Sequence, residues 1–369
     1  TTATTAAAAA ASSQQPGSPP QSDTKIDQNE AGKGGEEGRV ARWKRALLHG
    51  RGSGKAVVKQ LKPFSQWTGE LNEVNQRVIR ADVERTRGGV EYFRQESVRD
   101  KMEAMLTWWC QQHEVRYKQG LNEVLAPFIY LQAPEHEDPD AAPSDDEVFY
   151  GFATFLKRFV PFFDTEDFVA LECSLVFFRW LLLYHRPDLH HHLIDRGVTP
   201  ELFCMPWFLT LYASKTPLPL VLQLWDRLLE RAEPAFFLFL GVALVASEEH
   251  RILRSDGSCL PELLASLSFS SYELLEARWA AAEELHMRTP ASFIARLRKS
   301  VFRTTGRRAG PLGRRPSDVG DTTGSSFLHR RPSNESVDPL ERTDSSDTIE
   351  RTNSNSSNNS NNNNNSSNN

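Results

Sequence analysis

The sequence predicts an all-α protein in which one large helical domain lies between disordered ends. Between about residues 97 and 300, large apolar side chains recur every three or four positions, which is the spacing of one face of an α-helix. Pro187, Gly197, Pro217 and Pro234 interrupt this pattern, as residues at helix boundaries do. Alternating apolar and polar runs between hairpin turns, which indicate β-strands, are not evident in this region.

The two ends of the chain have a biased composition. Residues 1–38 consist largely of Thr, Ala, Gln, Pro, Ser and Gly, with almost no large apolar side chains. Residues 301–369 are rich in Arg, Pro, Ser and Asp, and from Asn353 onwards contain only Asn and Ser. Such segments cannot offset the entropy cost of ordering by burying apolar surface. We therefore expect both ends to be disordered and the folded domain to span residues 62–300.

Residues 39–61 form a basic lead-in to this domain. The stretch from Arg39 to Lys62 carries eight Lys and Arg residues and no Asp or Glu. It could contact an anionic membrane surface, where each basic residue contributes roughly 1 kcal/mol. It could equally be an ordinary solvated segment, and the sequence leaves both interpretations open.

The remaining composition excludes several classes of function. The formal net charge is -5 and the segment from Glu135 to Glu147 is mostly acidic, so nucleic acid is not an expected partner. The longest uncharged apolar stretch, Ala235 to Ala246, is shorter than the roughly 20 residues that cross a bilayer. The four cysteines lack the close pairs of zinc or redox sites. We expect no metal site and a cytoplasmic protein, with peripheral contact to endomembranes through residues 39–62 as an open alternative.

Apolar faces predict the order of the helices. The first three contain Val98–Trp109, Leu121–Ile129 and Val148–Phe159. Further helices are predicted over Glu166–Tyr184, Pro200–Ala213, Leu218–Arg231, Pro234–Glu248, Pro261–Leu267 and Tyr272–Met287. Several large aromatic side chains lie on these apolar stripes and are predicted to be core rather than ligand-binding residues: Trp207, Phe208, Trp225, Phe236, Phe237 and Phe239.

Two short polar stretches stand out against this apolar pattern. The first runs from Ile79 to Thr86 and places Asp82 one helical turn before Arg85. The sequence Arg87-Gly88-Gly89 follows at once, and a glycine pair ends a helix or opens a mobile loop. Arg85 should therefore project outward beside a turn.

The second stretch, Tyr117-Lys118-Gln119-Gly120-Leu121-Asn122, lies between two amphipathic helices. Gly120 allows a close approach of the backbone, and the amides of Gln119 and Asn122 lie where a helix begins. The polar residues of this stretch lie where the helical pattern alone would not require them.

The two stretches resemble the signatures I-x-x-D-x-x-R and Y-x-Q-G of the TBC domain of Rab GTPase-activating proteins. The resemblance continues through Pro206–Thr210 and Leu224–Asp226 and covers the chain from about Lys62 to Leu297. Residues 117–132 and 204–229 look most similar to the TBC region of TBC domain-containing kinase-like proteins. Leu121, where the family more often has Met, and the polar Arg87-Gly88-Gly89 loop depart from the pattern.

This resemblance implies a two-finger mechanism of GTPase activation. Arg85 would be an arginine finger inserted into the nucleotide site of a Rab-family GTPase in its GTP form, and Gln119 would orient the attacking water in trans. GTP and Mg²⁺ would belong to the partner GTPase, so no cofactor is expected in this chain. The resemblance implies supporting roles for Asp82, Tyr117, Gly120 and Asn122.

A non-catalytic adaptor that binds a GTPase or complex subunits through the same surface is the alternative. The unusual Gly88-Gly89 loop after Arg85 leaves this alternative open.

In the carboxy-terminal segment, the repeats Arg314–Ser317 and Arg330–Ser333 each place two arginines before a serine. Ser317 and Ser333 are therefore candidate phosphorylation sites.

Overall fold

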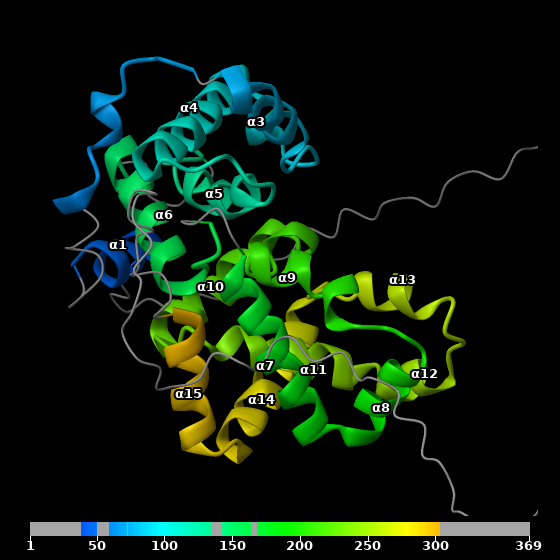
Figure 1. Ribbon diagram of the computed structural model, residues 1–369. Helices are drawn as coiled ribbons and strands as arrows, with labels where there is room; N and C mark the ends of the chain where they lie inside the picture. Colours follow the sequence, from blue (N-terminus) through cyan, green and yellow to red (C-terminus); the bar gives the residue numbers. More distant parts are fainter. Residues whose placement is uncertain (1–37, 50–58, 72, 135–141, 164–167, 303–369) are drawn as a thin grey trace, which may run out of the picture. The chain divides into compact units, whose positions relative to one another are not determined.

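The computed structural model describes residues 38–49, 59–71, 73–134, 142–163 and 168–302. Almost all of the two ends that were predicted to be disordered, together with Ser317 and Ser333, lies outside these residues. The described part contains helices and no strands, which confirms the all-α fold class (Figure 1). Its α-helices are α1 (Arg39–Lys44), α3 (Glu73–Arg85), α4 (Glu96–His113), α5 (Leu121–Tyr130), α6 (Asp145–Phe159), α7 (Val169–His185), α8 (Pro187–Asp195), α9 (Met205–Leu209), α10 (Leu218–Arg231), α11 (Phe236–Ser247), α12 (Glu249–Arg254), α13 (Leu260–Ala265), α14 (Tyr272–Arg288) and α15 (Ala291–Phe302).

The helices pack in two neighbouring groups. Helix α4 packs against α3 and α5, and α6 packs on α5 (Figure 1). Helix α7 packs against α8, α11 and α15, and α11 also packs on α14. Helix α10 contacts both α5 and α14 and so connects the two groups.

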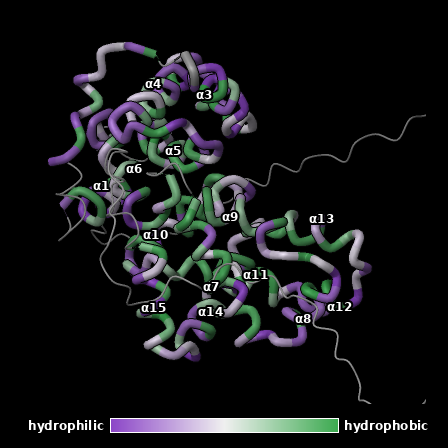
Figure 2. Tube along the Cα trace, in the orientation of Figure 1, coloured by the Kyte–Doolittle hydropathy of each residue, from purple (hydrophilic) through white to green (hydrophobic). Residues whose placement is uncertain are grey.

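Most predicted helices are found within a few residues of their expected ends. Hydrophobic and hydrophilic segments alternate along most of them, as amphipathic helices require (Figure 2). Helix α6 starts with a capping box, in which Ser144 Oγ accepts the Glu147 amide and the Glu147 carboxylate accepts the Ser144 amide. Pro187 begins α8 instead of only ending α7, because proline fits the first helical position.

The prediction of one helix over Pro200–Ala213 is wrong. The segment contains a 3₁₀ turn (Pro200–Leu202), the short helix α9 and a second 3₁₀ turn (Ala213–Lys215). Leu211 and Tyr212 have φ angles of 46° and 67°, which end the helix in the left-handed region. Tertiary hydrogen bonds hold this conformation, since the Tyr212 hydroxyl donates to the Phe237 carbonyl at 2.6 Å.

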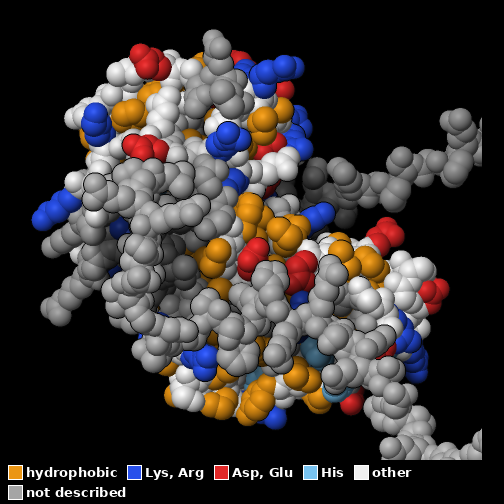
Figure 3. Space-filling model, in the orientation of Figure 1, with side chains coloured by type: hydrophobic (Ala, Val, Ile, Leu, Met, Phe, Trp, Pro, Cys, Tyr) orange, Lys and Arg blue, Asp and Glu red, His pale blue; other side chains and the backbone are white. Residues whose placement is uncertain are grey.

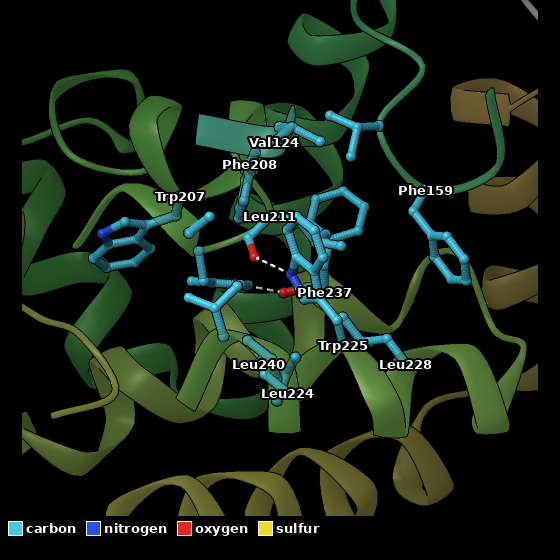
Figure 4. Close-up of a cluster of buried hydrophobic side chains, with 14 of the residues drawn as sticks. Val124, Phe159, Trp207, Phe208, Leu211, Leu224, Trp225, Leu228, Phe237 and Leu240 are labelled. Atoms are coloured by element: carbon cyan, nitrogen blue, oxygen red, sulfur yellow. Dashed lines mark hydrogen bonds between the residues drawn. The ribbon is translucent and has the colours of Figure 1, made fainter. Parts of the chain in front are cut away.

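The core contains the aromatic side chains that the sequence predicted to be buried. Trp207, Phe208 and Trp225 are each at most 1% exposed. In Figure 4 the Trp225 ring lies beside Leu211, and its Nε1 donates to the Leu211 carbonyl at 3.0 Å. Phe208 and Phe237 pack edge to face with ring centroids 5.0 Å apart. The prediction that these residues form the core is confirmed.

Helix α1 is part of this core, although the sequence predicted that residues 39–61 form a separate basic lead-in. Trp43 is 2% exposed and packs edge to face on Phe128 with centroids 5.2 Å apart. Its Nε1 donates to Asp226 at 2.6 Å, and Arg39 Nε lies 2.9 Å from the same carboxylate. Part of the basic charge is therefore balanced by an acidic residue of α10.

The surface carries charges of both signs. On the face shown in Figure 3, the described Lys and Arg side chains are interspersed with Asp and Glu. No helix in the described ranges is long and apolar enough to cross a membrane. These ranges also contain no group of three or more His, Cys, Asp or Glu residues that could hold a metal ion.

Candidate functional site

Helix α3 ends at Arg85 and presents this side chain to solvent. Ile79 and Val83 are at most 1% exposed and bury one face of the helix. Thr86 begins the next turn, and its hydroxyl donates to the Asp82 carbonyl at 2.7 Å. The Arg85 side chain is 62% exposed, so the end of the helix fixes its backbone while its guanidinium stays accessible.

Arg80 fastens α3 to α4 upstream of this end. Its guanidinium donates to Asp100 at 2.8 Å and to Glu103 at 2.9 Å, and it also pairs with Glu96. Hydrogen bonds to these carboxylates, the one to Asp100 first, raise the pKa of Arg80 above its ordinary value. A network of several charges stabilises the contact between α3 and α4 more than an isolated surface ion pair would.

Gln119 lies in the turn that opens α5. Glu114, the residue after α4, is in the left-handed region at φ 54°. Gly120, the residue before α5, has a φ of 106°. A Cβ at Gly120 would lie 3.3 Å from Thr210 Cγ2, so both the backbone angle and the space favour glycine. Gln119 is exposed directly before this residue.

The Asp82 carboxylate brings the two stretches together. Its Oδ1 lies 2.6 Å from Arg85 Nη2 and accepts the Gln119 Nε2 donor at 3.4 Å. Its Oδ2 lies 2.9 Å from the Tyr117 hydroxyl. Asp82 is 2% exposed, so one buried carboxylate orients two exposed side chains from segments that lie far apart in the sequence.

Buried hydrogen bonds support this arrangement. The Tyr117 hydroxyl lies 3.1 Å from Asn122 Oδ1 as well as near Asp82, and can give its one proton to either acceptor. Asn122 Oδ1 also accepts the Gly120 amide at 3.2 Å, and its Nδ2 donates to Thr86 Oγ1 at 2.9 Å. Burial, followed by the neighbouring Asp82 charge, raises the pKa of Tyr117, so the phenol stays neutral.

The structure thus gathers at one place the six residues that were predicted as fingers or as their supports: Asp82, Arg85, Tyr117, Gly120, Gln119 and Asn122. Sequence reasoning missed Thr86, which joins the two stretches, and Arg87, which forms an ion pair with Glu123 at 3.1 Å. The only sequence signal for that pair is an arginine before two glycines and a glutamate in a first helical turn. Neither feature indicates its partner.

His190, His191 and His192 lie on α8, away from this cluster in the chain, and take no part in it. The sequence from Gly50 to Lys55, whose glycines and lysine partly match a phosphate-binding loop, lies outside the described residues.

Several known proteins are similar in sequence to part of this chain. The chain spans about a fifth of the human TBC domain-containing protein kinase-like protein, with 28% identity over 180 residues that cover 48% of this chain and 19% of the relative. The protein of the same name from Dictyostelium discoideum is 30% identical over 114 residues, covering 31% of this chain and 10% of that one. The human TBC1 domain family member 5 is 25% identical over 215 residues, covering 45% and 27%.

A solved structure shows the same fold. The crystal structure of the Ypt/Rab-GAP domain of Gyp1p superposes with a TM-score of 0.54 at 16% identity, covering 68% of this chain and 88% of that one. The model of the Rab-GTPase-TBC domain matches residues 40–253, more than half of the chain. This chain therefore belongs to the Rab-GTPase-TBC domain family.

Proposed function

We propose that this protein is a GTPase-activating protein for a Rab-family small GTPase, with Arg85 as its arginine finger and Gln119 as its glutamine finger. The observation that carries the proposal is the convergence of both exposed side chains on the Asp82 carboxylate, at 2.6 Å and 3.4 Å. The partner would be the GTP-bound form, and GTP and Mg²⁺ would be held by the GTPase. By returning a Rab to its GDP form, the protein would regulate vesicle trafficking.

The chemistry of GTP hydrolysis explains the residue types. Phosphoryl transfer to water spreads negative charge over the transferred group, and a GTPase alone positions the attacking water imperfectly. A guanidinium is permanently charged and offers a planar fork of donors, which a lysine ammonium does not. An arginine finger accelerates hydrolysis by about 10³ to 10⁵ in other GTPases. The Gln119 side-chain carbonyl can accept a hydrogen bond from the attacking water, and its NH2 group can donate one to the phosphate.

The exposure of Arg85 also supports this role. A finger must enter the partner, so its guanidinium must be accessible in the free chain. The Arg85–Asp82 pair joins residues three apart, and 62% of the arginine side chain is exposed to solvent, which screens the attraction. A guanidinium has five N–H donors, so Arg85 can contact a phosphate while its Nη2 stays close to Asp82.

GTP hydrolysis across a panel of Rab proteins tests the proposal. On a responsive Rab, Arg85→Ala and Gln119→Ala should each abolish stimulated hydrolysis, and Arg85→Lys should not restore it. Arg251→Ala is the matched control, because Arg251 is 68% exposed and pairs with Glu248 three residues earlier. Full activity of both finger variants would overturn the mechanism. Binding of Rab·GTP without faster hydrolysis across the panel would favour the adaptor.

Peripheral membrane contact through residues 39–62 is a separate part of the proposal. Arg39 and Arg42 pair with Asp226, and Lys44 pairs with Glu147, so these side chains already have acidic neighbours. Lys59 and Lys62 are exposed and would make the contact. Deleting the segment would remove Trp43 from the core, so Lys59→Glu/Lys62→Glu is the sharper variant. Unchanged co-sedimentation of this variant with phosphatidylserine vesicles would reject the membrane role.

A further inference from the structure

The arginine that follows the candidate finger is held by the fold. Arg87 lies two residues after Arg85, and its side chain is only 11% exposed. Its φ angle of 50° is in the left-handed region, which is uncommon for a residue with a Cβ. A long charged side chain in such a backbone conformation requires contacts that hold it there.

Three segments supply those contacts. Arg87 Nε lies 3.1 Å from Glu123 Oε2 in the first turn of α5. Its Nη1 donates to the Thr216 carbonyl at 2.7 Å, and its Nη2 donates to the Ala213 carbonyl. One guanidinium therefore joins the end of α3 to the start of α5 and to the turn before α10.

Arg87 and Glu123 each stabilise the charged form of the other. Burial lowers the pKa of Arg87, and the Glu123 charge counteracts this effect. Burial raises the pKa of Glu123, and Arg87 is the first group that opposes the shift. Removing either partner would leave the other charged group without its counter-ion in a poorly solvated place, which is much less favourable than the pair.

Gly88 and Gly89 do not set the position of the finger. Neither has a φ in the left-handed region, and a Cβ on either would meet no atom within 4 Å. The Val90 amide donates back to the Arg87 carbonyl at 2.8 Å and closes the turn around them. The loop that looked flexible in the sequence is thus fixed at its first residue.

We infer that the Arg87–Glu123 ion pair is a positioning device that sets the arginine finger against the glutamine finger. The inference rests on the proposed function. Arg87 lies two residues after Arg85, and Glu123 lies four residues after Gln119, so the pair ties together the backbones from which both side chains extend. Catalytic groups must lie within about 0.5 Å of their productive geometry. The Asp82 contacts orient the two side chains, and the Arg87–Glu123 pair fixes the backbones from which they extend.

Arg87→Met keeps the bulk of the side chain and removes its charge and donors. The maximal rate of Rab GTP hydrolysis at saturating TBC protein should fall by about 10- to 100-fold, as displaced catalytic groups do. The KM for Rab·GTP should change much less, because Arg87 is largely buried and contributes little surface to the partner. Glu123→Gln should act in the same direction. Arg87→Lys should restore part of the rate, since an ammonium can reach Glu123 but cannot also serve both carbonyls.

Two controls separate positioning from general stability. Arg231→Met removes a half-buried guanidinium that pairs with Glu283 at 2.9 Å and joins α10 to α14, neither of which carries a finger. It should lower the melting temperature and leave the maximal rate unchanged. Gly88→Ala/Gly89→Ala should also leave the maximal rate unchanged.

Hydrogen exchange of the full chain gives a readout that does not need GTPase activation. Arg87→Met should speed exchange at the Val90 amide and at the first turn of α5, whereas Arg231→Met should not. Unchanged exchange there would overturn the inference even if the wild-type chain activates no Rab, a result that by itself would reject only the proposed function. A folded Arg87→Met variant with faster exchange but the wild-type rate on a responsive Rab would also overturn it.

Discussion

In the free chain, Arg85 Nη2 lies 2.6 Å from Asp82 Oδ1, and the carboxylate is buried while the guanidinium is exposed. The same oxygen accepts a hydrogen bond from Gln119 Nε2 at 3.4 Å. One carboxylate thus aims two side chains that would enter a partner, before the partner arrives. This arrangement reduces the side-chain conformational entropy that the two residues would otherwise lose on binding.

Replacing this carboxylate tests its role. Asp82→Asn keeps the shape of the side chain and an oxygen near Tyr117, but it removes the charge that holds Arg85. We expect the maximal rate of stimulated GTP hydrolysis to fall by about 10- to 100-fold, because the fingers lose their common anchor. Single-turnover hydrolysis by a responsive Rab measures this effect. A wild-type rate in a variant with normal circular dichroism would contradict it.

Gly120 should be intolerant of a side chain. Gly120→Ala places a Cβ at φ 106°, with Thr210 Cγ2 only 3.3 Å away. The expected loss in unfolding free energy is about 1–3 kcal/mol, measured by urea denaturation. Gly88→Ala is the matched control, because its Cβ meets nothing within 4 Å. That variant should be neutral or stabilised by up to about 1 kcal/mol. Equal stability of the two variants would refute the argument.

The Trp225 indole should contribute through its hydrogen bond as well as its packing. Its Nε1 donates to the Leu211 carbonyl at 3.0 Å, in a place where water cannot substitute. Trp225→Phe leaves that carbonyl without its donor and should cost about 1–3 kcal/mol, plus a contribution from the smaller ring. Trp180→Phe, at a site that is 46% exposed, should cost less than about 0.5 kcal/mol. Urea denaturation of both variants decides whether burial makes the difference.

His185 should make stability depend on pH. Burial, followed by the charges of Arg288 and Arg186, lowers the pKa of His185 from 6.5 to about 4. Below pH 6.5 the unfolded chain therefore binds a proton that the folded chain does not, and stability is lost as the pH falls from 6.5 towards 4. His185→Gln should lose less stability than the wild type between pH 7 and pH 5, as melting curves at both values would show. Parallel losses in the two proteins would contradict this account.

Several features of the fold could be predicted from the sequence because they depend on neighbours along the chain. The apolar stripe of α10 predicted its bounds, Leu218 and Arg231, since helical spacing is a local property. The same reasoning failed between Pro200 and Ala213. There the left-handed Leu211 and Tyr212 are held by bonds to α10 and α11, which no local pattern contains.

In the candidate site, too, some features could be predicted from the sequence and others could not. The sequence by itself determined the all-α class, most helices and the core aromatics. It also predicted Arg85 and Gln119 as candidate finger residues, because their motifs are short and contiguous. Only the tertiary structure decided that both side chains meet at Asp82, that α1 packs into the core, and that Arg87 is fixed by Glu123 and two carbonyls. The physical reason is the distance along the sequence between the residues that are in contact. Helix formation depends on residues three or four positions apart. Apart from the Asp82–Arg85 pair, these contacts join residues from 36 to more than 180 positions apart.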